Sequence, residues 1–199
     1  GEDAKILFLT GGMEVRMNGS CAGGTGAFID QMATLLNVTT EELDELSLKH
    51  ERIYPIASRC GVFAKTDIQP LLNQGAHKED VAASIFQAVV DQTVTGLSQG
   101  RRIAGKVLFL GGPLFFFKGL QQRFQETLKL GEGKAVFPSW AQYSVAIGAA
   151  IYTRGLEKSY TYEEFTGKLE NASSRSKSTH YLKPLFANQQ EHDEFIERH

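Results

Sequence analysis

Cysteine is scarce in this sequence, and its scarcity limits the kind of protein that the sequence encodes. Only 2 of the 199 residues are cysteine, Cys21 and Cys60, and they lie far apart. A small secreted domain held together by disulfides carries more cysteines at closer spacing. The pattern therefore excludes a disulfide scaffold, and composition alone predicts two buried, inert thiols in a cytoplasmic protein.

Long hydrophobic runs and an excess of positive charge are also missing. The longest apolar run, Leu108 to Phe117, is shorter than the roughly 20 residues that a membrane-spanning helix needs, and Gly111, Gly112 and Pro113 interrupt it. No signal-peptide pattern is visible. A net charge of -2 provides no basic surface for nucleic acid. We therefore predict neither a membrane nor a nucleic acid as a partner.

The order of the predicted elements indicates an α/β architecture with a mixed sheet. Two strands form a hairpin, a block of helices follows, and strand, helix, strand and helix complete the order. We predict strands at 4–10, 14–18, 106–110 and 134–137, and helices at 25–36, from 39 or 40 onward, and at 62–73, 78–99, 117–128 and 141–153. Pro70 should kink or break its helix.

Burial and domain limits follow from composition. The apolar strand at 106–110 should be buried, and the small residues of the helix at 141–153 should allow that helix to pack closely on a sheet. The stretch 171–179 is polar and rich in serine, which is typical of a linker. We therefore expect a folded body over residues 1–155 and a linker with a short helical tail over residues 156–199.

The stretch Asn18–Phe28, Asn-Gly-Ser-Cys-Ala-Gly-Gly-Thr-Gly-Ala-Phe, joins a predicted strand to a predicted helix. Gly23, Gly24 and Gly26 allow another backbone or a ligand to approach closely. Cys21 lies near the helix start, where the helix dipole favours a thiolate and equally an anionic ligand. A tight connection without any ligand would explain the glycines equally well.

The second cysteine has a similar setting. Cys60 and Gly61 come immediately before another helical run. Gly111 and Gly112 follow the predicted strand at 106–110, and a simple turn from strand to helix would account for them without a ligand. The five histidines fall in connectors and in the tail, without the paired spacing of metal ligands, so we interpret them as surface residues.

Taken together, these motifs resemble those of the BadF/BadG/BcrA/BcrD ATPase family, the activators (component A) of 2-hydroxyacyl-CoA dehydratases and benzoyl-CoA reductases. The matching segments are the end of a phosphate motif at 1–3, cysteine motifs at 17–28 and 58–64, and an adenosine motif at 110–112. They cover about residues 1–153 in the family's order. The resemblance implies the fold of the actin, sugar-kinase and heat-shock ATPase superfamily.

The resemblance also suggests how this chain relates to a whole activator. It looks like the second ribonuclease-H-like lobe of that fold with a helical insertion. The residues after Cys60 and the tail at 184–199 are similar to very long proteins that contain two activase modules. We therefore expect the chain to be a fragment of such a protein.

A shared iron–sulfur cluster follows from the resemblance. In that family the two cysteine positions bind a 4Fe–4S cluster between two subunits, which implies that Cys21 and Cys60 are metal ligands. A cluster takes four thiolates, and this chain would supply two of them. We therefore expect a homodimer or a pair of activase modules.

A site for ATP or ADP with Mg is the second implied cofactor site. Its candidate residues are the glycines of two turns and one basic side chain: Gly23, Gly24, Gly26, Gly111, Gly112 and Lys65. Asp67, on the same predicted helix as Lys65, is a further candidate beside the base. A solvated helix face would account for Lys65 and Asp67 equally well.

The implied function is ATP-dependent transfer of an electron from the cluster to a dehydratase or reductase component, through rearrangement of two lobes. We expect this chain alone to be inactive, because phosphoryl transfer needs charge-stabilising groups from both lobes. Two alternatives stay open. One is a metal-free actin-like ATPase or small-metabolite kinase lobe, and the other is a non-catalytic assembly module.

Overall fold

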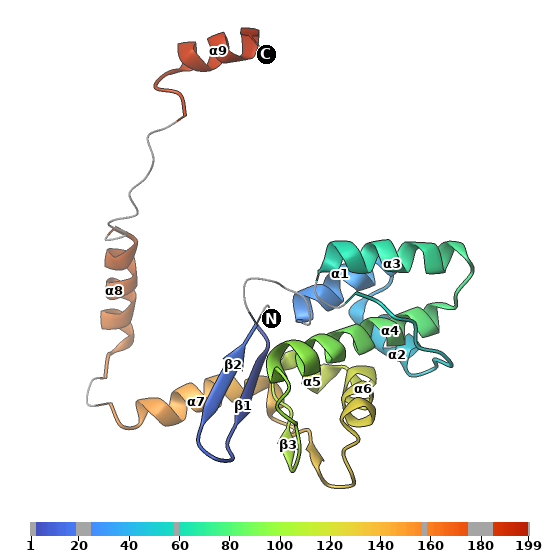
Figure 1. Ribbon diagram of the computed structural model, residues 1–199. Coiled ribbons are helices and arrows are strands. Elements are labelled where there is room, and N and C mark those ends of the chain that lie inside the picture. The colour runs from blue at the N-terminus through green and yellow to red at the C-terminus, as the bar shows by residue number, and fades with distance from the viewer. Residues whose placement is uncertain (1–2, 19–24, 58–59, 157–158, 175–184, 199) are drawn as a thin grey trace. The chain divides into compact units, whose positions relative to one another are not determined.

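The computed structural model describes residues 3–18, 25–57, 60–156, 159–174 and 185–198 (Figure 1). The chain divides into two compact units, Gly1–Ile151 and Tyr152–His199. Among the described residues, no helix has both the length and the apolar character needed to cross a membrane.

The first unit begins with the predicted hairpin, in which β1 (Lys5–Phe8) pairs antiparallel with β2 (Glu14–Met17). Its two faces have very different exposure. Phe8 is buried against the body, whereas Leu7 and Val15, which lie opposite one another, are both more than half exposed. The hairpin therefore presents an apolar face to solvent, and it contacts the body mainly through its other face.

The helical block contains the predicted helices at nearly the predicted positions: α1 (Gly26–Leu36), α2 (Thr40–Ser47), α3 (Gly61–Asn73) and α4 (Lys78–Asp91). Thr39 caps α2 in a reciprocal arrangement with Glu42, because each side chain accepts a hydrogen bond from the other's backbone N–H. Of the kink or break expected at Pro70, the break does not occur, since α3 continues through this residue to Asn73.

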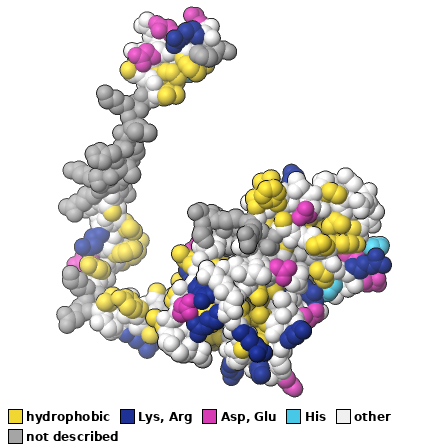
Figure 2. Space-filling model, in the orientation of Figure 1, with side chains coloured by type: hydrophobic (Ala, Val, Ile, Leu, Met, Phe, Trp, Pro, Cys, Tyr) yellow, Lys and Arg dark blue, Asp and Glu magenta, His cyan; other side chains and the backbone are white. Residues whose placement is uncertain are grey.

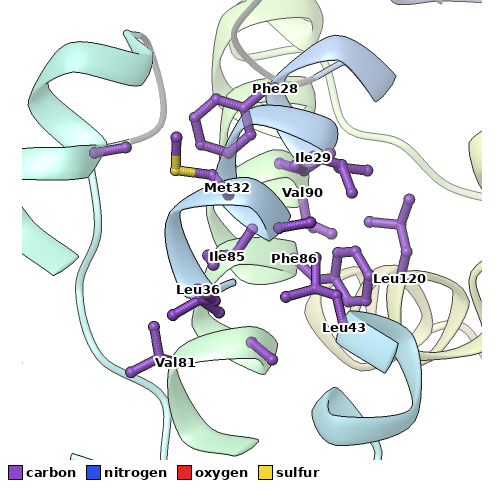
Figure 3. Packing of buried hydrophobic residues seen from close by; sticks show 14 of the residues in the cluster. Phe28, Ile29, Met32, Leu36, Leu43, Val81, Ile85, Phe86, Val90 and Leu120 are labelled. Atoms are coloured by element: carbon purple, nitrogen blue, oxygen red, sulfur yellow. The ribbon is translucent and has the colours of Figure 1, made fainter. Parts of the chain in front are cut away.

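The core forms around α4, in which ten of the 14 residues are buried. A helix that is buried on nearly every side is a central core element. Figure 3 shows residues of α1 and α2 packed against Ile85, Phe86 and Val90 of α4, with Leu120 beside Phe86. The helix predicted at 78–99 does not continue regularly, because η1 (Gln92–Leu97), a π-helical segment, follows α4.

The remainder of the first unit contains two short parallel strands, β3 (Val107–Leu108) and β4 (Ala135–Val136). The expectation of a fully buried strand is wrong, because Leu108 is 51% exposed. Phe109, just beyond β3, is buried and stacks on Phe137 with ring centroids 4.5 Å apart. In the described part of the chain, the strands pair as two separate ladders, one antiparallel and one parallel.

Four helices complete this unit: α5 (Gly112–Phe116), α6 (Lys118–Leu128), the short 3-10 helix η2 (Ala141–Tyr143) and α7 (Ser144–Thr153). No residue of α7 is buried, so the expected close packing of this helix on a sheet is wrong in this chain. Val145 is 84% exposed. Figure 2 shows hydrophobic side chains at the surface along this segment. Small side chains permit close packing, but they do not supply the surface to pack on.

The second unit contains α8 (Tyr162–Ser174) and α9 (Gln189–Arg198). The backbone N–H of Thr161 donates to Glu164, and the backbone N–H of Glu164 donates to Thr161, so α8 begins with a capping box. The ring of Phe186 contacts the side chains of His192 and Phe195 in α9.

A carboxylate of α2 caps the start of α6. Asp44 accepts hydrogen bonds from the backbone N–H groups of Lys118 at 2.9 Å and Gly119 at 2.8 Å. Burial raises the pKa of Asp44 above its ordinary value, although the two N–H donors act in the opposite direction. The two helices approach so closely that a side chain at position 119 would meet Ser47 and Phe86.

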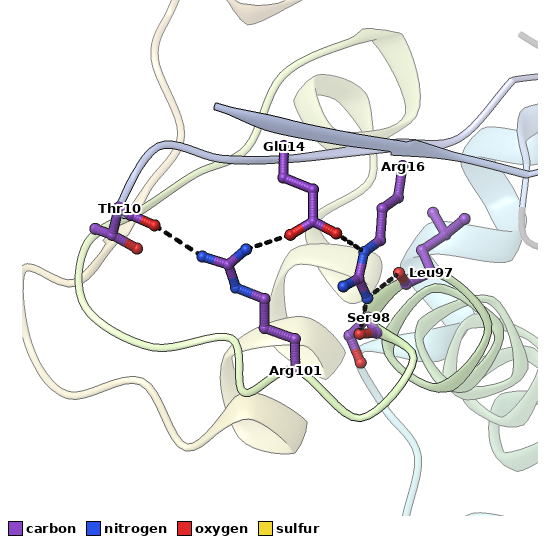
Figure 4. A network of polar contacts seen from close by, with 6 residues as sticks. All are labelled: Thr10, Glu14, Arg16, Leu97, Ser98 and Arg101. Atoms are coloured by element: carbon purple, nitrogen blue, oxygen red, sulfur yellow. Dashed lines mark hydrogen bonds and ion pairs between the residues drawn. The ribbon is translucent and has the colours of Figure 1, made fainter. Parts of the chain in front are cut away.

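Charged groups hold the hairpin on the body (Figure 4). Arg16 donates to Glu14 at 2.6 Å and to the carbonyl oxygens of Leu97 and Ser98 at the end of η1. The pKa of Glu14 is held below its ordinary value, chiefly by the hydrogen bond from Arg16. A cation favours the end of a helix, where carbonyl oxygens lack partners.

Arg101 completes this network from the segment after η1. It pairs with Glu14 and donates to the carbonyl oxygen of Thr10 at 2.8 Å. Its guanidinium also lies 4.1 Å from the ring centroid of Phe8. Arg101 therefore contacts both strands and the turn of the hairpin.

Gly119→Ala should destabilise the first unit, because the added methyl group would overlap Ser47 and crowd Phe86. We expect a loss of about 1–3 kcal/mol in the free energy of unfolding, measured by urea denaturation. Gly148→Ala in α7 is the matched control, because nothing lies within 4 Å of the added atom. The control should be neutral or slightly stabilising, and equal destabilisation by both variants would contradict the proposed close approach.

Arg101→Ala should loosen the hairpin, since it removes an ion pair, a hydrogen bond and a cation–π contact. We expect the amides of residues 5–17 to exchange with deuterium about tenfold faster, as for the loss of one or two net contacts. Arg102→Ala is the control, because its side chain is exposed and neighbours the same site. Unchanged exchange in Arg101→Ala would show that the attachment of the hairpin does not depend on Arg101.

Candidate functional site

The hairpin leads directly into the first cysteine motif, and Asn18 closes its open end. The side-chain oxygen of Asn18 accepts from the backbone N–H of Ala4 at 2.8 Å, and the backbone N–H of Asn18 donates to the carbonyl of Ala4 at 3.1 Å. The chain that continues toward the motif therefore leaves the hairpin from a fixed point. The predicted site residues Cys21, Gly23 and Gly24 lie outside the described residues.

The end of the first motif is described. Thr25 is the N-cap of α1, and Gly26 is the first residue of the helix, as the sequence predicts. Both residues are buried. The motif thus enters the body of the molecule at the helix that supplies Phe28 and Ile29 to the core.

Cys60 lies at the start of α3, in agreement with the prediction that each cysteine precedes a helix. It is the N-cap residue, its backbone is extended with φ -141° and ψ 127°, and its carbonyl accepts from the N–H of Ala64 at 3.0 Å. Cys60 is a free cysteine and is partly exposed, so it is not the fully buried thiol that composition alone suggests. Val62 and Phe63, which follow Gly61, are 70% and 64% exposed.

The start of α3 lies against α1. A Cβ atom placed on Gly61 would be 2.7 Å from Oε1 of Gln31, so only a glycine fits here without a shift of that side chain. Figure 1 shows the two helices side by side. The helix that follows the first cysteine motif and the helix that follows Cys60 are therefore neighbours.

The described part of the connector that leads to Cys60, residues 51–57, has no regular secondary structure, and side chains bind its backbone N–H groups. Asp80, buried in α4, accepts from the N–H of Glu51 at 2.8 Å and of Arg52 at 2.9 Å. Burial acts to raise the pKa of Asp80, but these two donors, together with the charges of His77 and Arg52, outweigh it and the pKa is lowered. Ser84 of α4 accepts from the N–H of Tyr54 at 2.8 Å.

The last anchor before Cys60 comes from α3 itself. Asp67 accepts a hydrogen bond from the backbone N–H of Ala57 at 2.7 Å. The sequence suggested Asp67 as a candidate beside a nucleotide base, and this contact was missed. The sequence held no signal for it, because Ala57 lies ten residues earlier in an irregular segment, outside the periodic pattern of the helix.

Cys60 fits one ligand position of an iron–sulfur cluster. Such clusters are held by cysteine thiolates, and a partly exposed free thiol at the start of a helix has suitable chemistry. Within the ranges that the structure describes, no three His, Cys, Asp or Glu side chains are grouped to hold a metal ion. The remaining ligands of a cluster would therefore have to include groups beyond these ranges.

The predicted adenosine turn follows β3. Gly111 has φ +101°, a conformation that favours glycine, and its N–H donates to the carbonyl of Ala141 at 2.9 Å. Gly112 begins α5 with an ordinary φ. No atom lies within 4 Å of a Cβ built on either glycine. The turn is thus held in place and leaves open space beside its backbone.

Lys65 is exposed on α3, and its side chain has no hydrogen-bond or ion-pair partner among the residues described. A polar pocket lies between the connector and the start of α4, lined by Glu51, Arg52, Tyr54 and His77 among others. Neither Lys65 nor the glycines of the adenosine turn line this pocket.

Comparison with known proteins connects these features to a family. The model of the BadF/BadG/BcrA/BcrD ATPase family matches residues 1–153. The chain is 34% identical over 157 residues to the (R)-2-hydroxyglutaryl-CoA dehydratase activating ATPase of Acidaminococcus fermentans, which covers 76% of this chain and 57% of that protein. The chain therefore spans little more than half the length of this relative.

Solved structures show the same relationship. The crystal structure of (R)-2-hydroxyglutaryl-CoA dehydratase component A from A. fermentans superposes with a TM-score of 0.68 at 33% identity, over 76% of this chain and 57% of that one. The structure of the activator of 2-hydroxyisocaproyl-CoA dehydratase from Clostridium difficile, with bound ADPNP, superposes with a TM-score of 0.67 at 27% identity. The match covers 91% of this chain and 62% of that one. The chain has the actin-like ATPase fold of these activators and belongs to the BadF/BadG/BcrA/BcrD ATPase family.

Proposed function

We propose that this chain is the second lobe of an ATP-dependent activator, and that it supplies two thiolates, Cys21 and Cys60, to a 4Fe–4S cluster shared with a second copy or module. The observation that carries the proposal is the position of Cys60. It is a partly exposed free thiol at the N-cap of a 13-residue helix, within a chain that belongs to this family.

The neighbouring helices support the pairing of the two cysteines. Because α3 begins against Gln31 of α1, Cys60 lies beside the helix that the first cysteine motif enters. Four thiolates complete a cluster, so two copies would contribute two each. The exposed side chains of Val62 and Phe63 beside Cys60 give a second copy an apolar surface to contact.

The nucleotide site is proposed at the turn of Gly111 and Gly112, with Gly23, Gly24, Gly26 and Lys65 as further candidates. The open space beside this turn supports it, as does the bound ADPNP of the related activator. A Mg ion would accompany the phosphates. Gly112 allows adenosine to approach the backbone, which a side chain would prevent.

The limits of the lobe are part of the proposal. We place the lobe at residues 1–155 and a linker with a helical tail at 156–199. The relatives are longer than the matched region, the apolar face of the hairpin is exposed in this chain, and no residue of α7 is buried. A first lobe packed on such surfaces would supply the other half of a nucleotide cleft.

Electron transfer to a dehydratase or reductase component is the proposed role of the whole activator. The related proteins are named as activators of such dehydratases. A bound cluster would supply a one-electron reductant. The contribution of this chain is to hold the thiolates at the starts of helices in the same lobe as the nucleotide site. A movement of the lobe can therefore change the surroundings of the cluster.

Anaerobic treatment of the reduced chain with iron and sulfide should give a visible chromophore and about two irons per chain, half of a 4Fe–4S cluster. Iron counting and analytical ultracentrifugation together measure the stoichiometry and the expected dimer. Cys21→Ser and Cys60→Ser should each abolish the chromophore. His192→Ala, in the tail, is the control for nonspecific iron binding and should not change it. A dimer that binds no iron would contradict the proposed cluster, and the alternative of a metal-free ATPase lobe would remain.

Gly112→Ala should weaken the binding of ADP with magnesium about tenfold or more, because a methyl group would occupy the space proposed for adenosine. Titration calorimetry measures this effect. Gly131→Ala is the matched control, since it also has no atom within 4 Å of the added Cβ and no positive φ. Equal affinities of the two variants would exclude Gly112 from the nucleotide site.

A further inference from the structure

The connector before Cys60 is held by side chains instead of by regular secondary structure. Asp80 and Ser84 of α4 bind its first half, at the N–H groups of residues 51, 52 and 54. Asp67 binds its last described residue, Ala57. The first two anchors attach the connector to the core helix, whereas the third attaches it to the helix that Cys60 begins.

Asp67 is well placed to act on Cys60 through the backbone. Ala57 precedes Cys60 by three residues, which is at most about 10 Å of chain. Asp67 lies seven residues after Cys60, two turns along the same face of α3. It is partly buried, while its neighbours Lys65 and Thr66 are exposed. A carboxylate that accepts a backbone N–H makes a stronger hydrogen bond than a neutral group does.

We propose that Asp67 is a positioning residue for Cys60: its carboxylate fixes the point from which the chain enters α3, and this fixes the thiol at the helix N-terminus. Without the bond to Asp67, the N–H of Ala57 would lose its anchor. The segment before Cys60 would then move more freely relative to α3, and the position of the thiol would be less well defined. The metal-binding consequence of this inference rests on the function proposed above, but the positioning itself does not.

The test uses the full chain without iron, fully reduced, and three variants: Asp67→Ala, Asp67→Asn and Gln69→Ala. Asparagine keeps an acceptor oxygen and removes the charge, so it separates positioning from electrostatics. Gln69 is an exposed residue of the same helix that bonds only to Asn73 among the residues described, and it serves as the matched control. Circular dichroism verifies that each variant is folded.

Two measurements report on the position directly. The Ala57 amide should exchange with deuterium about tenfold faster in Asp67→Ala, since a charge-assisted hydrogen bond is lost. The rate of alkylation of Cys60 by iodoacetamide, resolved from Cys21 by mass spectrometry, should differ by about threefold or more between Asp67→Ala and the unmodified chain, since access of the reagent depends on where the thiol lies. Asp67→Asn and Gln69→Ala should stay within about twofold of the unmodified chain in alkylation rate.

The outcomes separate this inference from the proposed function. If Asp67→Ala and Gln69→Ala give the same Cys60 alkylation rate, Asp67 does not position the thiol. If Asp67→Asn behaves like Asp67→Ala, the charge and not the hydrogen bond is responsible, which also overturns the inference. If the unmodified chain binds no iron, the proposed function fails. Deuterium exchange at Ala57 and alkylation of Cys60 would still show whether Asp67 positions the thiol. If it binds iron, Asp67→Ala should retain less iron than Asp67→Asn.

Discussion

Burial of α4 is the constraint on which the first unit depends. Ten of its 14 residues are buried, and α1, α2, α3 and α6 all contact it. Its polar residues are used as well as its apolar ones, because Asp80 and Ser84 bind the irregular connector that returns along the helix. One helix therefore provides both the hydrophobic core and the attachment of the segment that leads to Cys60.

Local signals in the sequence predicted most of the elements. The glycine pair of the hairpin, the capping residue Thr39 and the spacing of apolar residues in α1 and α4 each act over a few positions, so they can be read without a tertiary structure. The start of α3 at Cys60 was also predicted from a local signal of this kind. The family could be identified for the same reason, since each of its motifs is a short run of residues at a strand end or a helix start.

Burial was predicted less well, because it depends on surfaces that other segments provide. The apolar patterns of β3 and α7 favour burial, yet Leu108 is half exposed and no residue of α7 is buried. Asp67 is an example of the opposite case, a polar residue that is partly buried. An acidic residue on a helix usually faces solvent, and nothing in the local pattern indicates that Ala57, ten residues earlier, donates to it. Contacts between irregular backbone and a distant side chain leave no periodic signal.

The two cysteine motifs are attached to the body by different physical interactions. The hairpin before the first motif is held by Arg16, Glu14 and Arg101, whose contacts are partly exposed and are weakened by salt. The connector before Cys60 is held by buried or partly buried acceptors on core helices, which salt screens much less. The attachment of the hairpin should therefore depend on ionic strength more than that of the connector does.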